Sequence, residues 1–494
     1  MSRRGRYVLA GILAAAAAIR LYRLGHFSYG LDEILQSDWI AGSSDFFWRS
    51  LRGDAYHPPL DYVVDRAFEA LGPSDAARKL PSVVWGLATI AAFAGVLSRR
   101  LGETAGLTGA ALLALAPFHV RFSQELRPYS LGLLFIALSL YLLERFLERP
   151  GVLRLALLYL ACLGACYSLY TAAFVLALAA GVLLLEDAFD RDPARRRAAR
   201  RFLLFSPAFA FALWAGYLPW WPVLRELSSR PPAAEVVALT LSRVDRILAF
   251  LAFAPDDGYR LGGAGALFVL LLAAGAVQAA RRPRARFLLA WGIGGLAGIE
   301  ILGRIHPHYD FARRFVPAGP GLAALAALSL AALLARPVTR LAGGALLAAA
   351  LVLDARGLRV YFREGRADWR TLTDAIRAQS APSERVFTEN QYSQLAVAFY
   401  MVGPRWLCDV QTGRPVSRDV PNLEGQAVRL TWAWKPGSRA WLVLAGVPQS
   451  PALREWARRL PCREYPRAER AVLCRLDPET RDASLALISE AHGP

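Results

Sequence analysis

Residues 104–146 read TAGLTGAALLALAPFHVRFSQELRPYSLGLLFIALSLYLLERF, two apolar runs separated by the polar turn SQELRPY. Each run is long enough to cross the hydrocarbon core of a bilayer as a helix, which takes about 20 residues. Similar runs recur along most of the chain, and inside a membrane only helices and closed barrels satisfy every backbone polar group. The sequence therefore predicts an α-helical polytopic membrane protein with about eleven transmembrane helices, possibly twelve or thirteen.

The charge distribution supports this prediction. The chain has 494 residues, 55% of them hydrophobic, and a net charge of +18. Its basic residues lie in short clusters between the apolar runs, as the positive-inside rule expects of cytoplasmic loops. We therefore expect membrane lipids and no nucleic acid as partners. Arg3, Arg4 and Arg6 place the N-terminus in the cytoplasm. The apolar segment that follows them has no small-residue cleavage site and is expected to stay as the first span.

The predicted spans alternate so that nearly every arginine cluster falls on one side of the membrane. The cytoplasmic connections are expected at 98–103, 144–154, 188–201, 281–286 and 336–340. Segment 59–72 carries Asp61, Asp65, Arg66 and Glu69, and we interpret it as an amphipathic helix at the interface. The eleven spans are 7–22, 80–97, 104–121, 125–146, 153–168, 171–187, 202–218, 264–280, 287–303, 314–335 and 338–354.

The chain changes character near residue 356. The tail is polar and alternates helix-like with strand-like stretches, which is typical of an α/β domain. Its helices are expected at 368–380, 393–403 and 451–460, and its strands at 385–390, 405–410, 439–447 and 470–476. The predicted domains are thus a transmembrane domain over 1–355, which includes an outer loop 23–79, and an extracytoplasmic domain over 356–494. Cys462 and Cys474 flank a hairpin in the tail. The sequence is equally compatible with a disulfide between them and with two free thiols.

Two groups of candidate functional residues lie in the outer loop. Asp32 and Glu33 follow the first span, where one carboxylate can serve as general base and the other as its electrostatic partner. Helix capping explains the same two acids more simply. His57 precedes two prolines that stiffen the chain. It can contact a phosphate or an acceptor, or it is an ordinary loop histidine.

A third group lies in the turn between two predicted spans. Glu125, Arg127 and Tyr129 sit where ionisable groups are costly and tend to be functional. The guanidinium of Arg127 suits a phosphate because it donates two parallel hydrogen bonds. An internal ion pair between Glu125 and Arg127 is an equally good interpretation.

A fourth group interrupts two late spans between Arg304 and Arg314. Its members are ionisable or aromatic and are His306, His308, Tyr309, Asp310, Arg313 and Arg314. The two histidines and the aspartate match no strong metal signature, so we expect no metal and no other cofactor. An anion site for a lipid phosphate at the two arginines is simpler. The alternative is that these arginines reach towards lipid headgroups.

The order of these motifs resembles the bacterial members of the GT-C superfamily of glycosyltransferases. An acidic pair follows the first span, then HPPL at 57–60, SQELRPY at 123–129 and RRFVPAGPGLA at 313–323. The protein O-mannosyltransferase and lipid A aminoarabinose transferase families are the most similar. The resemblance implies a polyprenyl-phosphate-linked sugar donor and inverting transfer to a hydroxyl on the periplasmic face. It further implies Asp32 as base, with Glu33 beside it, and basic residues that stabilise the departing phosphate.

The sequence leaves other functions open. An oligosaccharide transferase or ligase with a larger lipid-linked donor is the alternative among enzymes. A transporter or lipid flippase is the alternative of another class, although no internal repeat of the kind common in transporters is evident. The acceptor is a lipid, a glycan or a protein, and the location is expected to be a bacterial inner membrane. There the N-terminus would be cytoplasmic and the C-terminal domain periplasmic.

Overall fold

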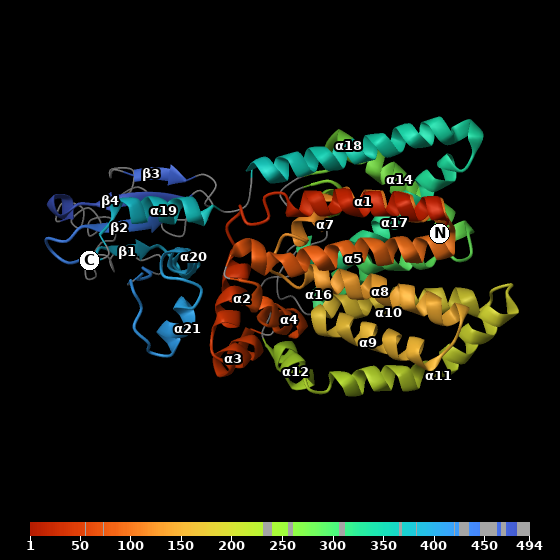
Figure 1. The fold of residues 1–494 in the computed structure, drawn as a ribbon, viewed down its shortest axis with the longest axis horizontal. Coiled ribbons are helices and arrows are strands. Elements are labelled where there is room, and N and C mark those ends of the chain that lie inside the picture. The colour runs from red at the N-terminus through yellow and green to blue at the C-terminus, as the bar shows by residue number, and fades with distance from the viewer. Residues whose placement is uncertain are drawn as a thin grey trace. The chain divides into compact units, whose positions relative to one another are not determined.

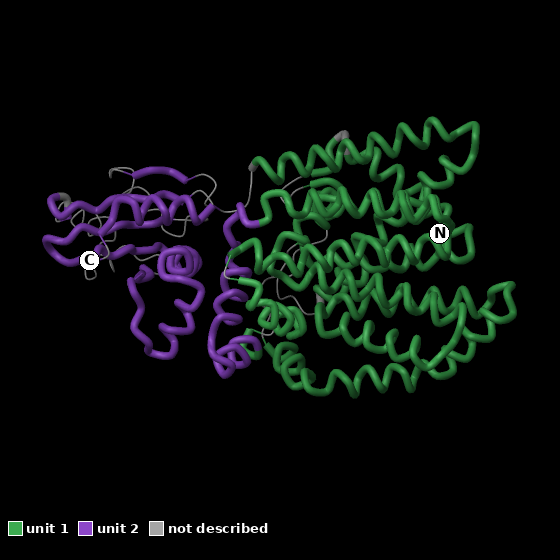
Figure 2. The backbone as a smooth tube through the Cα atoms, viewed as in Figure 1, with its two compact units in different colours: residues 1–24, 52–363 green, residues 25–51, 364–494 purple. Residues whose placement is uncertain are grey.

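The computed structural model describes most of the chain and divides it into two compact units. The described residues are 1–54, 56–72, 74–230, 240–254, 260–305, 312–364, 368–381, 383–418, 420–423, 434–444, 462–465 and 471–481. Unit 1 comprises residues 1–24 and 52–363, and unit 2 comprises residues 25–51 and 364–494 (Figure 2). Each unit is described by itself.

Unit 1 is built from helices, most of which run side by side (Figure 1). Its long helices are α1 (Arg3–Leu21), α5 (Asp75–Leu101), α6 (Glu103–Leu115), α8 (Tyr129–Glu148), α9 (Val152–Ser168), α10 (Tyr170–Ala188), α11 (Pro193–Tyr217), α13 (Leu241–Ala252), α14 (Gly262–Arg281), α16 (Gly295–Ile305), α17 (Gly319–Leu334) and α18 (Arg340–Glu364). Its shorter helices are α4 (Leu60–Phe68), η1 (Glu69–Leu71), α7 (Pro117–Phe122), α12 (Trp221–Ser229), α15 (Phe287–Leu289), η2 (Ala290–Gly294), η3 (Ala312–Ala318) and η4 (Pro337–Thr339). The helix α3 (Ser44–Asp54) crosses the boundary between the units.

Helices occupy every predicted span, which confirms the predicted fold class. Five helical segments within the described residues are long and apolar enough to cross a membrane, and the bent pair α11 and α12 adds a sixth. The segments α6, α9, 265–281 and 287–303 are apolar but shorter. The number of spans therefore stays a prediction. The helix α4 has 9 residues, or about 14 Å at 1.5 Å per residue. That is too short to cross a core about 30 Å thick.

A break divides the predicted span 104–121. The helix α6 ends at Leu115, Ala116 has a ψ of 119°, and α7 begins at Pro117. Proline has no backbone N–H to continue the hydrogen bonds of α6, so its position explains the break. The following helix begins at Tyr129, four residues later than predicted, and residues 123–128 form a loop. The polar motif of the sequence is thus loop over most of its length.

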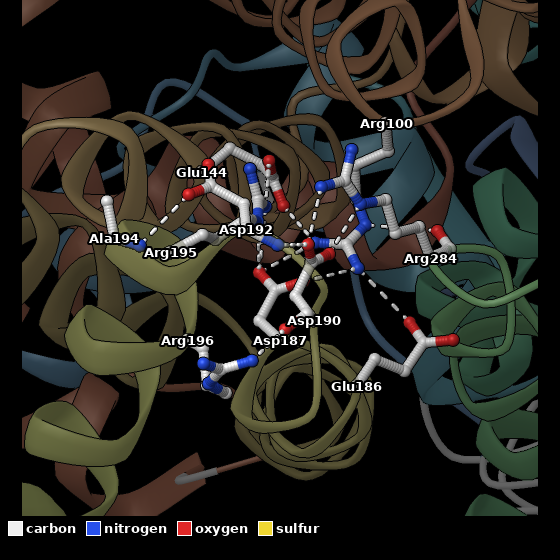
Figure 3. Close-up of polar contacts among 10 residues, drawn as sticks. All are labelled: Arg100, Glu144, Glu186, Asp187, Asp190, Asp192, Ala194, Arg195, Arg196 and Arg284. Atoms are coloured by element: carbon white, nitrogen blue, oxygen red, sulfur yellow. Dashed lines mark hydrogen bonds and ion pairs between the residues drawn. The ribbon is translucent and has the colours of Figure 1, made fainter.

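Buried ion pairs join four helices at the end of unit 1 that holds the N-terminus (Figure 3). Arg100 of α5 donates to Glu144 of α8 and to both carboxylate oxygens of Asp187 of α10, the latter at 3.2 Å. Arg195 of α11 donates to Glu144 at 2.6 Å and to Asp187 at 2.8 Å. The side chains of Arg100, Glu144 and Asp187 are fully buried. Each charge in this network is therefore paired within the protein, as burial requires.

The network brings together four of the five connections predicted to be cytoplasmic. The connection 281–286 joins it through Arg284, which donates to both oxygens of Asp190 at 2.7 and 2.9 Å. Ser2 donates its backbone N–H to Glu103 at 2.5 Å, so the N-terminus lies at this end as well. The sequence predicts these arginines to be exposed charges in loops, but the side chain of Arg100 is buried in ion pairs. The positive-inside pattern thus includes structural arginines.

Unit 2 contains a four-stranded sheet in the order β1-β2-β4-β3. The strands are β1 (Arg385–Thr388), β2 (Ala440–Leu444), β3 (Cys462–Tyr465) and β4 (Ala471–Leu476), and only β1 and β2 are parallel. The helices are α2 (Leu31–Ala41), α19 (Trp369–Gln379), α20 (Gln391–Met401), α21 (Trp406–Gln411) and the short η5 (Pro478–Thr480). Tyr29 and Ile34 share one apolar core with Trp369, Leu372 and Val386.

This core explains why the units differ from the predicted domains. Residues 25–51 were expected with the transmembrane domain, but α2 packs against α20 and α21. The predicted helices 368–380 and 393–403 and the strands 385–390, 439–447 and 470–476 correspond to described elements. The predicted strand 405–410 is wrong, because the segment forms α21. The predicted helix 451–460 lies outside the described residues. Cys462 and Cys474 form a disulfide between paired positions of β3 and β4.

Loss of one charge from the buried network should destabilise the protein. In Glu144→Gln, Arg100 and Arg195 lose a carboxylate while the shape of the side chain is kept. Breaking a buried pair costs about 3–5 kcal/mol, so the midpoint of thermal unfolding in detergent should fall markedly. The matched control is Asp374→Asn, which breaks an exposed pair with Arg377 and should cost about 1 kcal/mol or less. Equal shifts in the two variants would contradict the assignment.

Asp38 of α2 should make the stability of unit 2 depend on pH. Its carboxylate is 3% exposed, and Oδ1 accepts the N–H of Leu407 at 3.0 Å. Burial raises the pKa of Asp38 to about 7, although the backbone donors at Leu407 and Cys408 oppose the shift. The folded state therefore holds a proton that the unfolded chain releases near its ordinary pKa of 3.8. The free energy of unfolding should be highest below about pH 4 and fall as the pH rises to about 7.

Asp38→Asn tests this dependence because an amide cannot ionise. Unfolding of the full chain should be followed at about pH 5 and about pH 8 for both proteins. We expect the substitution to reduce the loss of stability between the two pH values. Parallel profiles of the wild type and the variant would show that Asp38 is not the group responsible.

Candidate functional site

Four aromatic rings connect segments that are far apart in the sequence. The ring of His57, in the loop before α4, lies 5.8 Å from that of Tyr129 at the start of α8. Tyr129 lies 4.4 Å from Phe122 of α7, which lies 6.1 Å from Phe250 of α13. The structure thus brings the HPPL and SQELRPY motifs together and adds α13 to them.

The loop 123–128 presents two buried ionisable side chains. Glu125 and Arg127 are 3% and 7% exposed. Glu125 accepts a hydrogen bond from Nε of Arg121 at 2.9 Å, so the residue four positions earlier is a partner that the sequence analysis did not consider. The guanidinium of Arg121 also lies over the ring of Phe122 at 5.8 Å. Arg121 therefore fixes the carboxylate of Glu125 relative to α7.

A second group of charges lies between α13, α16 and η3. Arg243 of α13 donates to Oε1 of Glu300 at 2.8 Å, and Arg314 of η3 donates to Oε2 at 3.2 Å. Arg243 and Glu300 are buried, and Arg313 and Arg314 are partly buried. One carboxylate therefore holds two guanidinium groups in place. Headgroup contacts alone do not account for Arg314.

An apolar groove is lined by residues of α4, α8 and α9. Its volume is about 520 Å³, and its lining is almost entirely apolar. Leu60 lies three residues after His57, and Phe135 lies six residues after Tyr129. The lining residues are Leu60, Phe135, Leu138, Leu142, Leu157, Leu160, Ala161, Leu163, Gly164 and Tyr167. The groove thus runs along α8, the helix that begins at Tyr129.

The acidic pair belongs to unit 2. Glu33 is 1% exposed, and its Oε2 accepts the N–H of Gly30 at 3.0 Å. This bond closes the first turn of α2, so helix capping explains Glu33. Asp32 lies in the same turn and is partly exposed. Of the two carboxylates, only Asp32 retains the exposure that a general base needs.

Part of the fourth candidate group is not described. His306, His308, Tyr309 and Asp310 lie outside the described residues. Among the residues that are described, no three metal-ligating side chains come together. The expected independence of metal therefore stays a prediction.

Sequence analysis missed several buried charged residues. Arg243 and Glu300 were not singled out, although Glu300 lies inside the predicted span 287–303, where an acid is itself a functional signal. Lys79 of α5 is 1% exposed and is one of only two lysines in the chain. Asp61 and Asp65 were noticed for their charge, but their burial within unit 1 was not foreseen.

The arrangement in unit 1 suits an anionic group attached to an apolar chain. Fixed guanidinium groups stabilise negative charge that develops on a leaving phosphate, since they need no reorganisation as the bond breaks. An apolar groove in the same unit can take hydrocarbon out of the lipid without exposing it to polar groups.

A family model described as dolichyl-phosphate-mannose-protein mannosyltransferase matches residues 56–220. This stretch contains His57, Glu125, Arg127 and Tyr129 but not Asp32. The comparison with curated proteins gives no match.

Two crystal structures of ArnT from Cupriavidus metallidurans match over 100% of both chains. The apo form is 15% identical with a TM-score of 0.53, and the form bound to undecaprenyl phosphate is 14% identical with a TM-score of 0.54. Identity at this level shows a shared fold. Together with the family match, it confirms the resemblance to the GT-C superfamily of membrane glycosyltransferases that the sequence motifs predicted.

Proposed function

We propose that this protein transfers a sugar from a polyprenyl-phosphate donor to an acceptor hydroxyl at the outer face of a bacterial inner membrane. The apolar groove lined by α8, which begins at Tyr129, and by α4, which follows His57 in the chain, carries this proposal. A polyprenyl phosphate has the same two parts, a long apolar chain and an anionic head. The crystal structure of ArnT with undecaprenyl phosphate shows that a protein of this fold binds such a lipid.

The leaving group needs positive charge. When the anomeric carbon–oxygen bond breaks, the released polyprenyl phosphate carries one more negative charge than it did in the donor. Arg127 in the loop 123–128 and Arg314 in η3 are proposed to bind that charge. They would bind the transition state more tightly than the ground state, which lowers the barrier.

The acceptor hydroxyl needs a base. We propose that Asp32 takes its proton as the oxygen attacks the anomeric carbon, with inversion of configuration. The new bond joins the acceptor oxygen to the sugar, and the polyprenyl phosphate leaves. This assignment rests on the family resemblance and on the exposure of Asp32, since Glu33 caps α2. The reaction is proposed to be independent of metal.

The acceptor is proposed to be a lipid, a glycan or a protein. The N-terminus is proposed to be cytoplasmic and unit 2 periplasmic, because of the one-sided arginine clusters. An oligosaccharide transferase would use the same lipid site, and transfer from donors with one sugar or many distinguishes the two enzymes. A transporter or flippase would consume no donor.

Substitutions of Asp32 and Glu33 test whether Asp32 is the general base. Asp32→Asn keeps the shape but removes the proton acceptor, so turnover should fall by a factor on the order of 100 or more. Glu33→Gln is the matched control, because glutamine also accepts the N–H of Gly30. We expect this variant to fold and to keep most of its activity. Turnover of the purified variants on a polyprenyl-phosphate sugar is the measurement, and wild-type turnover by Asp32→Asn would eliminate this base.

The proposed role of the arginines in binding the phosphate can be tested with one variant that keeps the charge but changes the shape of the side chain, and with others that remove the charge. Arg127→Lys keeps the charge but loses the planar fork, so kcat should fall by about tenfold, and Arg127→Ala should lose more. Arg314→Ala should also lower kcat. The control is Arg377→Ala in unit 2, whose guanidinium forms an exposed pair with Asp374. If Arg127→Ala and Arg314→Ala both transfer sugar at the wild-type rate, the role in phosphate stabilisation is ruled out.

The groove predicts a dependence on the length of the lipid. Leu160→Trp should fill part of the groove and raise KM for a long polyprenyl donor more than for a short one. Leu153→Trp is the matched control, because Leu153 lies on the same helix and is exposed but does not line the groove. Kinetics with donors of two chain lengths give the comparison. An equal effect on both donors would place the lipid elsewhere.

A further inference from the structure

Arg20, in the last turn of α1, is fully buried and contacts three helices. Its Nη1 donates to the carbonyl oxygens of Ala16 at 3.1 Å and Ala114 at 3.0 Å. Its Nε donates to Oγ of Ser123 at 3.2 Å, and its Nη2 lies 2.7 Å from Nδ1 of His119. Four of the five N–H groups of the guanidinium are thus engaged. The motifs recognised in the sequence do not include this residue.

The acceptors around Arg20 are dipoles rather than carboxylates. Arg20 lies in the last turn of α1, Ala16 one turn earlier and Ala114 in the last turn of α6, and Ser123 is the residue at which α7 ends. The C-terminal end of a helix carries partial negative charge, which favours a cation. Among the described contacts of Arg20, two backbone carbonyls, a hydroxyl and a histidine ring take the place of an acidic partner. This is how the protein accommodates a buried arginine at that position.

The break at Pro117 creates one of these acceptors. In a continuous helix the carbonyl of Ala114 would accept the N–H of residue 118. The chain turns away at Ala116, so Ala114 lies in the final turn of α6, where carbonyls lose their helical donors. Arg20 supplies a donor to it. The same guanidinium contacts His119 and Ser123 of the next element, so it joins the two sides of the break.

The loop 123–128 is attached to α1 at the same place. Nε2 of Gln124 donates to the carbonyl oxygens of Arg20 at 2.8 Å and Tyr22 at 2.9 Å. Oγ of Ser123 donates to the carbonyl of His119 at 2.6 Å. The first two residues of the loop are therefore fixed by α1, and Glu125 and Arg127 follow within three residues.

We propose that Arg20 is a positioning residue that holds the loop 123–128, and through it Glu125 and Arg127, in the geometry used for transfer. It is fully buried and acts through Ser123, His119 and Gln124. The kinetic part of this proposal rests on the proposed function. The structural part concerns the order of the loop alone.

Hydrogen–deuterium exchange of the full chain in nanodiscs tests the structural part without any substrate. Arg20→Met should speed exchange of amides in 123–128 by about tenfold or more, since loss of about 1.4 kcal/mol of protection gives that factor. Amides within α8 should change little. Arg20→Lys should recover most of the thermal stability, because its charge still meets the helix ends, but not the slow exchange of the loop, because it lacks the fork.

The matched control is Arg100→Met. Arg100 is also a fully buried arginine near the end of a helix, but it belongs to the ion-pair network near the N-terminus. This variant should lose stability while exchange in 123–128 stays close to that of the wild type. If exchange in the loop is unchanged in Arg20→Met, or rises equally in Arg100→Met, the positioning role is overturned.

Steady-state kinetics test the catalytic part. Arg20→Lys should lower kcat by 10- to 100-fold, on the order expected for a small misplacement of a catalytic group, with KM nearly unchanged. In the Arg127→Lys background the same change should cost much less, because coupled residues are not additive. Additive losses would overturn the link to Arg127. If the loop behaves as expected but wild-type protein consumes no polyprenyl-phosphate sugar, the proposed function fails and the anchoring of the loop remains.

Discussion

Buried arginines in the helical unit depend on acceptors that the protein supplies, because the hydrocarbon around a transmembrane domain has none. The structure meets this requirement in three ways. Arg100 and Arg195 pair with Glu144 and Asp187 in a network of both signs. Arg243 and Arg314 share one carboxylate, that of Glu300. Arg20 binds the carbonyl ends of helices and a histidine. The first arrangement joins helices, and the other two lie beside segments that carry candidate site residues.

The break at Pro117 links the fold to the candidate site. A continuous helix through residues 104–121 would leave Ala114 bonded within α6 and would carry His119 and Ser123 further along the same axis. Because the chain turns at Ala116, α7 and the loop after it lie where Phe122 meets Tyr129 and Phe250. One proline therefore accounts for a helix end that Arg20 can cap and for the placement of a loop that holds two buried charges.

Sequence alone predicted the elements whose length the bilayer determines. Apolar runs must be about 20 residues long to cross it, so α5, α8 and α10 could be located from hydropathy. Contacts between residues that are far apart in the sequence could not be predicted. The pairing of Glu300 with Arg243 joins residues 57 positions apart. The segment that forms α21 was predicted as a strand, since the sequence does not show that Asp38 of a distant segment accepts the N–H of Leu407 in the first turn of this helix.

In the candidate site, too, features that depend on neighbouring residues in the sequence could be predicted, and features that depend on distant residues could not. The family resemblance assigned His57 and Tyr129 to one function, but only the structure shows that their rings are in contact. The capping role of Glu33 is local and was weighed correctly as an alternative, since acids favour the first turn of a helix. The groove combines side chains from α4, α8 and α9, and no pattern within one helix reveals it. Burial of Lys79 and Arg20 likewise depends on neighbours that sequence does not place.

The lining of the groove helps to separate the enzyme from a transporter or flippase. A flippase must move a charged headgroup through the bilayer, and the cost of an unpaired charge in hydrocarbon requires polar side chains along that path. The groove offers leucines from Leu60 at one end to Leu142 and Leu157 further along, and its lining contains no ionisable residue apart from the phenol of Tyr167. Such a surface suits a lipid chain better than a phosphate. The arginines that suit the phosphate lie in other elements, on a loop and at helix ends. The proposed sugar transfer needs these two features, an apolar surface for the chain and positive charge for the head, whereas a flippase needs polar side chains along the path of the head.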